Sequence, residues 1–343
     1  MTTLTGIILV VSAGLLIGSM SWPMKVCPNL SFGHMWLTGM VAGLLIAPWT
    51  LSLLAVPDLF DAYAQVPLAT LLKANFFSLA WGIANVLFGI SVTRIGASLS
   101  MAILTGIGAS LGVTLPMILK GSGLFAGAPS LFSTPGAVVL AGVAIMLGGV
   151  MLCARSGRLR ESAAGASTAR RGSYTANMLI ITLCGVLSAG ISFTFIFSQD
   201  EIVRAVSAKG AGPVAANASV WAIALLAGML VNVVYPAILI VREGSWSKFV
   251  QYPGQIFLSA LIGIQFFTGV LLMGQGMLAL GVLGASVGFG MSQGMQIVGG
   301  QILGFLSGEW LGAPLKARSL ILAALVLLLA AAVILALANT LPK

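Results

Sequence analysis

The chain has 343 residues, of which 59% are hydrophobic and only 7% are charged, and its mean hydropathy is +1.10. An ordinary soluble domain carries roughly 25% charged residues, so this composition excludes a water-soluble globular protein and indicates an integral membrane protein. The net charge of +9 comes from 16 basic and 7 acidic residues. Because the basic residues lie in the breaks between apolar runs, we attribute the charge to membrane topology and expect no nucleic-acid partner.

Ten apolar runs approach the length of about 20 residues that a helix needs to cross a bilayer. The runs lack strand-type alternation, so we expect an all-α integral membrane protein with ten transmembrane helices. In chain order the runs cover residues 5–22, 35–54, 71–91, 97–119, 137–154, 178–197, 220–241, 256–278, 284–305 and 320–337.

A basic segment at 155–174 divides the runs into two groups of five, in 1–154 and 175–343. This segment holds five arginines and one glutamate, which is typical of a solvated loop. With ten crossings, the odd-numbered loops carry 11 of the 16 basic residues. The excess of Lys and Arg on cytoplasmic loops therefore predicts a cytoplasmic linker and places both termini in the periplasm.

The two halves resemble each other weakly. AGLLIGSMSWPM from Ala13 is similar to CGVLSAGISFTF from Cys184, and GASLSMAILTG from Gly96 is similar to GASVGFGMSQG from Gly284. Because five is an odd number, a duplicated five-helix unit must insert upside down relative to its twin. We therefore expect two inverted five-helix repeats, an arrangement typical of transporters that bind their substrate near the bilayer midplane.

Five side-chain amides fall near the middle of the apolar runs, in a chain that is almost free of charge. A buried amide needs hydrogen-bond partners, and in hydrocarbon it cannot take them from water. Amides near one depth predict a polar cavity inside the bundle, whose neutral donors and acceptors suit a neutral, hydroxyl-rich solute. The five are Asn85, Asn232, Gln265, Gln293 and Gln296.

Helical spacing pairs some of these residues. Trp81 and Asn85 are four residues apart, and Gln293 and Gln296 are three apart, so each pair shares one helix face. A tryptophan beside an amide offers a stacking surface with a hydrogen-bonding group, and two neighbouring glutamines offer groups for two hydroxyls. The alternative for every one of these amides is a hydrogen bond between helices, which needs no ligand.

Ser21 and Ser192 occupy matching positions in the two halves, and each is followed by an aromatic residue. We expect the two hydroxyls to line the mouths of the cavity. The alternative is helix packing in which each hydroxyl bonds to the backbone of its own helix.

Several segments resemble bacterial L-rhamnose–proton symporters. WGIANVLFG at 81–89, followed by RIGAS at 94–98, is similar to the W-G-x-x-N-x-x-x-G segment of that family, and PMKVCPNLSFGHMW at 23–36 is similar to its P-x-K…M-W stretch. LSAGISF at 187–193 is similar to F-S-A-G-M-S-F, and QFF at 265–267 and GEW at 308–310 also match.

The resemblance implies the drug/metabolite transporter superfamily, with two inverted five-helix repeats, alternating access and uptake of a methylpentose with a proton. Two segments depart from the family. The lysine-rich run after the first helix is reduced to Lys25, and the aromatic-rich part of the ninth helix reads GFGMSQGMQ at 288–296. The second departure leaves the identity of the sugar open.

A proton-coupled carrier needs a titrating group along its path. His34 is the only histidine, but it falls at the start of the second apolar run, where the alternative is an anchor at the membrane interface. No acidic residue lies in the middle of a run, and Asp200, Glu201 and Glu309 come closest, near run ends. Proton coupling is therefore an implication of the resemblance alone.

Motifs for catalysis are missing from the sequence: it has no His/Cys metal spacing, no G-x-S-x-G and no Walker A. We expect no enzyme activity, metal or cofactor. We predict a multi-pass secondary transporter, in contact with lipid in a bacterial inner membrane, that imports a neutral monosaccharide, most simply L-rhamnose by proton symport. The alternatives are a facilitator or differently coupled carrier of another sugar, a small-metabolite exporter of the same fold, and a non-transporting membrane sensor.

Overall fold

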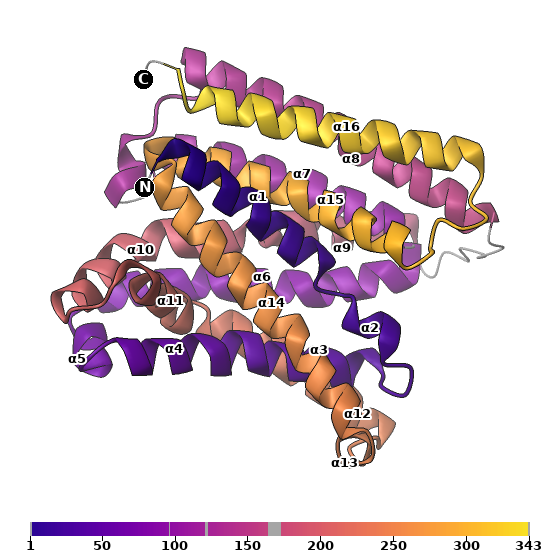
Figure 1. Cartoon of the computed structure of the whole chain (residues 1–343), viewed down its shortest axis with the longest axis horizontal. Coiled ribbons are helices and arrows are strands. Elements are labelled where there is room, and N and C mark those ends of the chain that lie inside the picture. The colour runs from indigo at the N-terminus through magenta and orange to yellow at the C-terminus, as the bar shows by residue number, and fades with distance from the viewer. Residues whose placement is uncertain (1, 96, 121–122, 164–172, 342–343) are drawn as a thin grey trace.

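A computed structural model describes residues 2–95, 97–120, 123–163 and 173–341 (Figure 1). Within these ranges every regular element is helical, which confirms the predicted all-α class. Among the described residues, eight helices are long and apolar enough to cross a membrane. They are Thr3–Val26, Phe32–Ala55, Leu68–Ser91, Thr134–Ala163, Thr175–Ala208, Leu226–Glu243, Pro253–Ala279 and Leu315–Ala338.

Two expected spans are not among these eight. The first corresponds to α7 (Ala97–Leu119), a helix of 23 residues whose part Ile103–Leu119 is apolar. The second corresponds to α15 (Phe289–Leu306), which follows the π-helical turn η4 (Gly284–Gly288). α15 carries three glutamines, and these polar side chains lower its hydropathy.

Four of the expected spans contain or adjoin an irregular turn. The run at 178–197 forms α9 (Tyr174–Ser188) and α10 (Gly190–Ala208), and the run at 220–241 forms α11 (Pro213–Ala224) and α12 (Leu226–Glu243). In the same way, α1 (Thr3–Ser19) is followed by α2 (Pro23–Val26), and α3 (Phe32–Met40) passes through the π-turn η1 (Val41–Ile46) into α4 (Ala47–Ala55). Thr3–Val26, Phe32–Ala55 and Thr175–Ala208 each remain one candidate span across these irregular turns.

Proline explains the interruptions in the first two runs. Pro23 and Pro48 lack a backbone N–H, so each removes one hydrogen bond from a continuing helix, and each lies at the first or second position of the helix that follows. The breaks at Ala189 and Leu225 have no proline, but they lie where glycines bring helices together. A Cβ at Gly190 would lie 2.3 Å from the carbonyl oxygen of Phe77, and one at Gly228 would lie 2.5 Å from that of Ser78.

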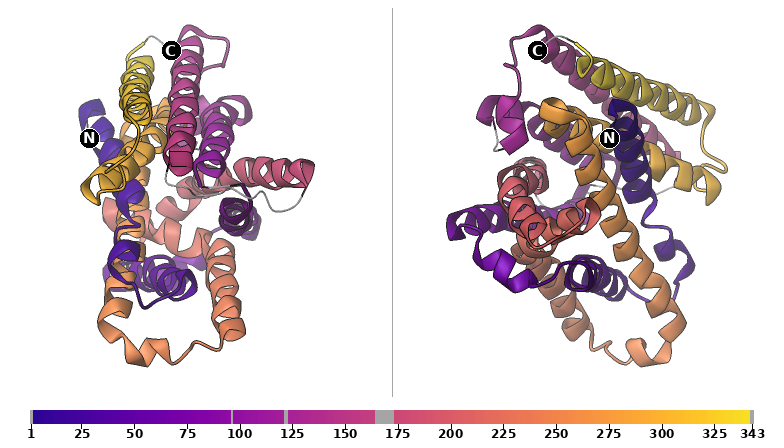
Figure 2. Two further views of the ribbon diagram at one scale, coloured as in Figure 1. Left: turned by 90° about the vertical axis from the view of Figure 1, so that its right-hand side faces the viewer. Right: turned by 60° about the vertical axis from the view of Figure 1, so that its left-hand side comes forward.

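The remaining long helices are α6 (Leu68–Ile95), α8 (Thr134–Ala163), α14 (Pro253–Ala279) and α16 (Leu315–Ala338). α8 and α16 lie side by side along one edge of the molecule, at the top of Figures 1 and 2. α1 packs against α14 and α15, and α6 packs against α9, α10 and α12. α8 continues to Ala163, so residues 155–163 of the expected linker are helical, whereas 164–172 lie outside the described residues.

Close backbone contacts hold the bundle together. A Cβ at Gly263 of α14 would lie 1.6 Å from the carbonyl oxygen of Gly39, and one at Gly18 would lie 2.0 Å from that of Gln296. Only glycine fits at such approaches, and small residues are the usual means by which membrane helices pack. These contacts bring α1 directly against the glutamine-bearing part of α15.

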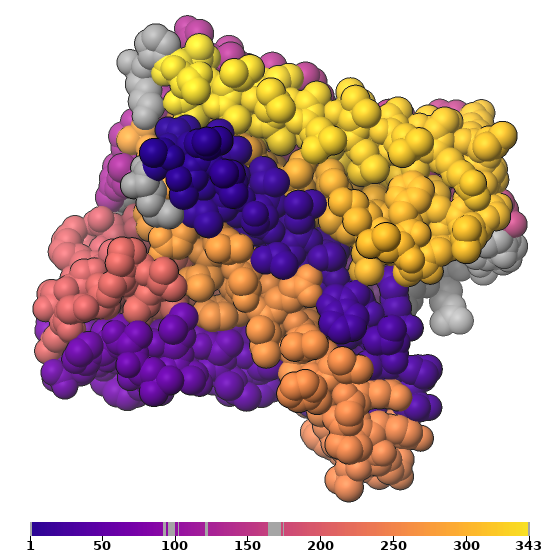
Figure 3. Space-filling model, in the orientation of Figure 1, coloured from indigo at the N-terminus to yellow at the C-terminus, as the bar shows by residue number. Residues whose placement is uncertain are grey.

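The short elements gather at the two ends of the bundle. Both chain ends lie on the left of Figure 1, together with α5 (Leu59–Ala64), and we name this side the terminal end. α2, α13 (Lys248–Gln251) and the 307–314 segment lie on the other side, which we name the linker end. The surface of the α12–α14 region extends from the molecule there, at the lower right of Figure 3. The last elements are η2 (Gly123–Gly127) and η3 (Gly281–Leu283).

Candidate functional site

A cavity of about 200 Å³, which we name the central cavity, lies between α1, α3, α6, α7, α14 and α15. Its polar lining is neutral and comes from both halves of the chain: Asn85, Thr105, Ser188, Gln293 and Gln296. Its aromatic lining consists of Trp36, Trp81, Phe88, Phe266 and Phe289. Among the described residues that line it, none is charged, so the cavity suits a neutral ligand with hydrogen-bonding groups.

A second hollow of about 350 Å³ extends this cavity toward the linker end, and we name it the vestibule. It shares Trp36, Gln293 and Gln296 with the central cavity and adds Ser21 and Gln301. Ser21 therefore lies on the wall of the vestibule, and its role there stays a prediction. A ligand in the central cavity would reach the linker end through the vestibule.

The two glutamines of α15 form one polar unit at the cavity wall. Gln296 Nε2 donates a hydrogen bond to Gln293 Oε1 at 2.5 Å, as their three-residue spacing allows. Within the described residues, Gln293 Nε2 and Gln296 Oε1 have no hydrogen-bond partner. The pair thus offers an amide donor and a carbonyl acceptor to a ligand.

Asn85 reaches the central cavity from α6, where Asn232 of α12 holds it. Asn232 is 1% exposed, and its Oδ1 accepts hydrogen bonds from Asn85 Nδ2 at 3.0 Å and from Trp36 Nε1 at 3.1 Å. Its Nδ2 donates to the Gly228 carbonyl at 2.9 Å. Asn232 thus holds the side chains of Asn85 and Trp36 by hydrogen bonds inside the protein.

Trp81 forms part of the aromatic wall, as its spacing from Asn85 predicts. Its ring stacks on Phe266 of α14, with the centroids 5.7 Å apart and an interplanar angle of 14°. Flat aromatic faces beside amides are the usual surface for a ring that is apolar on its faces and polar at its edge. Trp81 and Asn85 thus contribute to one wall from one helix.

Gln265 lies in the middle of the apolar helix α14, and its polar atoms form hydrogen bonds with groups at the end of α1. Nε2 donates to the Leu16 carbonyl at 2.8 Å and to Ser19 Oγ at 2.9 Å, and Oε1 accepts from Trp22 Nε1 at 3.1 Å. The last carbonyls of a helix have no partner within that helix, and here a glutamine from α14 supplies one. This geometry favours the structural alternative for Gln265 over a role in binding a ligand.

Ser192 lies apart from the lining of the central cavity and the vestibule. It is 1% exposed, and its hydroxyl has no hydrogen-bond partner among the described residues. Ser21 lines the vestibule and Ser192 lines neither hollow, so the two serines do not occupy equivalent places at a cavity.

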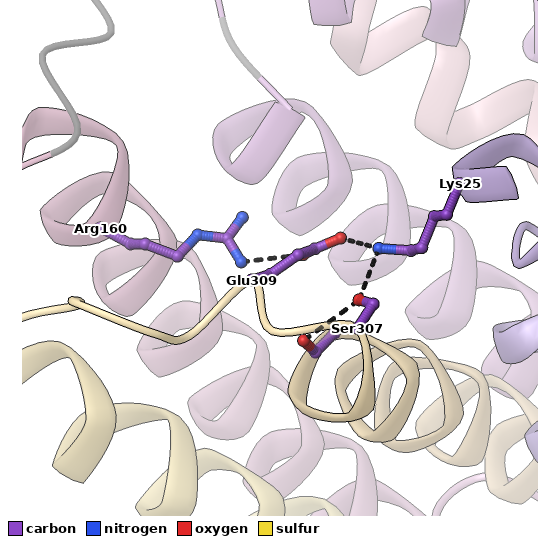
Figure 4. Close-up of polar contacts among 5 residues, drawn as sticks. Lys25, Arg160, Ser307 and Glu309 are labelled. Carbon is purple, nitrogen blue, oxygen red and sulfur yellow. Dashed lines mark hydrogen bonds and ion pairs between the residues drawn. The ribbon is translucent and has the colours of Figure 1, made fainter. Parts of the chain in front are cut away.

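Three of the acidic candidates form ion pairs. Asp200 and Glu201 pair with Arg204 within α10, at 2.7 Å and 3.6 Å. Glu309 accepts from Lys25 of α2 and, at 3.0 Å, from Arg160 Nη1 of α8, while Lys25 also donates to Ser307 Oγ at 2.9 Å (Figure 4). Partial burial acts to raise the pKa of Glu309, but the hydrogen bonds and charges of Lys25 and Arg160 outweigh it and hold this pKa below its ordinary value.

His34 is fully buried, which its predicted alternative as an interfacial anchor does not anticipate. Its Nδ1 lies 2.9 Å from Ser31 Oγ, and its Nε2 lies 2.9 Å from the Ser245 carbonyl. Sequence reasoning singled out the histidine as the only one in the chain but gave no partner for it. The part of the chain that the structure describes holds no cluster of three His, Cys, Asp or Glu side chains fit for a metal.

Sequence reasoning missed several lining residues. Trp36 follows His34 by two residues in the matched 23–36 segment, and Phe266 lies inside the matched QFF segment, so both stood within quoted motifs. Gln301 follows Gln293 by eight residues, a spacing that keeps both on one helix face. Phe88 likewise lies inside the matched 81–89 segment, and Thr105 lies inside the repeat segment that begins at Gly96.

Comparisons with known proteins agree with this picture. The chain is 31% identical over 211 residues to an L-rhamnose-proton symporter of Citrobacter koseri, a match that covers 61% of this chain but only 59% of that protein. A protein of the same name from Cronobacter sakazakii is 27% identical over 296 residues, or 84% of each chain. The one from Salmonella typhimurium is 29% identical over 253 residues, 71% of this chain and 72% of that protein.

The family model for the L-rhamnose-proton symport protein (RhaT) matches residues 2–339. That family comprises transporters and not enzymes, and its match together with the apolar helices marks a multi-pass membrane protein. Because the match covers nearly the whole chain, the protein belongs to the L-rhamnose-proton symport family.

Proposed function

We propose that this protein imports L-rhamnose together with a proton. The observation that carries the proposal is the central cavity, where neutral amides from both halves of the chain face flat aromatic rings. Hydroxyl groups of a sugar accept from and donate to amides, and the C–H faces of a pyranose pack on aromatic rings. Apolar lining residues, among them Met20 and Met273, suit the methyl group that distinguishes a 6-deoxy sugar.

Recognition would divide between the two halves. Asn85 and the stacked Trp81 come from α6, whereas Gln293 and Gln296 come from α15. The two sets are chemically different, so the cavity is asymmetric, as the binding of one chiral sugar requires. Asn232 supports this arrangement through Asn85 and Trp36.

We further propose ten membrane crossings in two inverted repeats, 1–154 and 175–343. The packing supports this: α1 lies on α14 and α15, and its counterparts α9 and α10 lie on α6, with α9 also on α7. In the same way, α3 packs on α14 as α12 packs on α6, and α7 packs on α8 as α15 packs on α16. Such an exchange of equivalent contacts is what a two-fold axis between two repeats produces.

Glycine pairs follow the same exchange. Gly43 and Gly263 meet between α14 and the helix that continues α3, and Gly82 and Gly228 meet between α6 and α12. Rocking of the two repeats about the central cavity would expose it to either side in turn. The vestibule faces the linker end, which the charge count predicts to be cytoplasmic, so we assign this arrangement to the inward-facing state of an inner-membrane carrier with periplasmic termini.

The test is uptake of radiolabelled L-rhamnose into proteoliposomes that contain the purified protein. We expect uptake that a pH gradient, acid outside, accelerates and drives above equilibrium. Uptake that ignores the gradient would indicate a facilitator or another coupling ion, and gradient-driven efflux would indicate an exporter. A protein that binds rhamnose without moving it would support the sensor. No binding of L-rhamnose or of any simple hexose would overturn the sugar assignment.

A further inference from the structure

A chain of polar groups joins α3 to the end of α12 at the linker end. Ser31 Oγ lies 2.9 Å from His34 Nδ1 and 3.1 Å from Glu243 Oε2. His34 Nε2 lies 2.9 Å from the Ser245 carbonyl, and Ser245 Oγ donates to Glu243 Oε2 at 3.2 Å. His34 is fully buried, whereas Glu243 is exposed, so the chain runs from water into the protein.

The hydrogen bonds among Ser31, His34, Ser245 and Glu243 require one hydrogen more than a neutral imidazole and an ionised carboxylate supply. A carbonyl oxygen only accepts, so His34 Nε2 carries a hydrogen. The two contacts of Ser31 Oγ need two hydrogens, and the hydroxyl supplies one. The other must sit on His34 Nδ1, which makes an imidazolium, or on Glu243, which makes a carboxylic acid. A neutral imidazole with an ionised carboxylate would leave one of the two contacts without a hydrogen.

The intact chain therefore holds one exchangeable proton that His34 and Glu243 share. A proton that reaches Glu243 from water can pass to His34 through the Ser31 hydroxyl: the hydroxyl gives its hydrogen to Nδ1 and takes one from the carboxyl. With the proton, the chain is neutral overall; without it, the chain carries one negative charge next to a buried ring.

The surroundings contain few other groups that titrate. Near the start of α3, the charged or titratable side chains on neighbouring elements are Cys27, Tyr235, Arg242, Lys248 and Tyr252. α14, which also packs on α3, has no acidic, basic, histidine, cysteine or tyrosine residue between Pro253 and Ala279. Neither basic residue pairs with Glu243 among the described ion pairs, and the ring of Phe249 lies 5.2 Å from the His34 ring.

The two helices that hold these polar groups, α3 and α12, also contribute residues at the central cavity. On α3, Trp36 follows His34 by two residues and donates to Asn232 of α12, which in turn holds Asn85. At Gly33, a Cβ would lie 3.2 Å from Ile240 of α12, so α3 and α12 also touch at a point on α12 between Asn232 and Glu243. A change in the contact between α3 and α12 at His34 thus reaches the residue that we expect to bind the sugar.

We propose that His34, Ser31 and Glu243 form the proton-binding site of this carrier. The proposal rests on the proposed function and assigns its proton to particular side chains. Proton uptake completes the hydrogen-bonded chain and holds α3 against the end of α12; proton release removes one of its hydrogens and lets the two helices separate. Since coupling between two ligands is reciprocal, the sugar must alter proton binding by the factor by which the proton alters sugar binding.

The transport test uses His34→Gln and Glu243→Gln in proteoliposomes, with Asp58→Asn as the matched control. Asp58 is an exposed carboxylate outside the chain of groups, and its backbone is left-handed, a conformation that asparagine also accepts. We expect both test variants to lose rhamnose-induced proton uptake and roughly tenfold or more of the accumulation that a pH gradient drives. Exchange of labelled for unlabelled rhamnose at equal pH should stay within about threefold of the wild type. Asp58→Asn should behave as the wild type in both assays.

A second measurement needs no variant. Because His34 is the only histidine, ¹⁵N-histidine labelling of protein purified with a histidine-free tag gives one imidazole signal. We expect L-rhamnose to change the chemical shifts of this signal at constant pH, because binding of the sugar and binding of the proton are coupled. A signal that rhamnose leaves unchanged, in protein that binds rhamnose, would overturn the proposal even if His34→Gln does not fold.

The outcomes separate this site from the function on which it rests. Gradient-driven accumulation by His34→Gln at the wild-type level would overturn the proton site and leave rhamnose transport intact. If the wild-type protein does not bind rhamnose, the proposed function is lost, and the histidine signal still decides on the shared proton. A signal that Glu243→Gln does not alter would then exclude it.

Discussion

Two glutamine sites at membrane depth differ in one respect that decides their roles. On α14, Nε2 and Oε1 of Gln265 form hydrogen bonds with three groups at the end of α1. Gln293 and Gln296 on α15 bond to each other and keep a donor and an acceptor free at the wall of the central cavity. An amide whose hydrogen bonds are complete stabilises the fold, and an amide whose hydrogen bonds are incomplete can bind a ligand.

The largest effect should come from removing free amides on both sides of the central cavity. We expect Asn85→Ala combined with Gln296→Ala to weaken L-rhamnose binding roughly 100-fold, because each lost hydrogen bond is worth about 1–1.5 kcal/mol. Isothermal titration of detergent-purified protein measures this, and an unchanged thermal midpoint shows that the variant is folded. Normal rhamnose binding by the double variant would remove the cavity from the proposed function.

Gln265→Ala should give the opposite pattern. It leaves the Leu16 carbonyl and Trp22 Nε1 without their partner, so we expect a loss of about 1–3 kcal/mol of stability. Rhamnose affinity of the folded fraction should stay within about threefold of the wild type, a difference below 1 kcal/mol. Thermal unfolding and binding, measured on one preparation, test the contrast with Gln296. A stable variant that fails to bind rhamnose would make Gln265 a ligand residue and reverse the comparison.

Asn232 lies between these two extremes and sharpens the comparison. Its Oδ1 and Nδ2 each have a hydrogen-bond partner, and two of these bonds orient residues of the cavity wall. We expect Asn232→Ala to weaken rhamnose binding about tenfold through loss of order in Asn85 and Trp36, with a moderate loss of stability. In the background of Asn85→Ala the effect on binding should shrink, since the two residues act together. Additive effects in that double-mutant cycle would contradict the positioning role.

The smallest effect concerns Glu309, a carboxylate whose partners are also complete. Its pKa in the folded protein lies below the reference value of 4.5, so the ion pairs stabilise the fold fully above pH 4.5 and cease to do so as the pH falls through the lowered value. Because the Glu309 side chain is 41% exposed, solvent screening limits the gain to about 1 kcal/mol or less.

The measurement compares thermal midpoints of the wild type and Glu309→Gln at pH 7 and at pH 4. The wild type should be slightly more stable at pH 7, and the difference should narrow at pH 4. A difference that grows at the lower pH would show that Lys25 and Arg160 do not lower the pKa of Glu309.

Much of the fold follows from composition and periodicity. Apolar runs near bilayer length predict helices, and the eight spanning helices lie within or around the predicted runs. The interruption after α1 has a local cause that the sequence displays, in Pro23. The breaks at Ala189 and Leu225 have no such marker, because they lie where neighbouring helices approach Gly190 and Gly228. Such approaches depend on residues more than 100 positions away.

For the site, the amino-acid pattern specifies which polar groups enter the membrane and, through helical spacing, that Trp81 shares a face with Asn85 and Gln293 with Gln296. Which amides have partners depends on how the helices pack. Gln265 meets the end of α1, Asn232 meets Trp36, and His34 meets Ser31 and the distant Glu243. The physical reason is that depth in the membrane is a local property of one helix, whereas a hydrogen bond between helices depends on how the bundle packs.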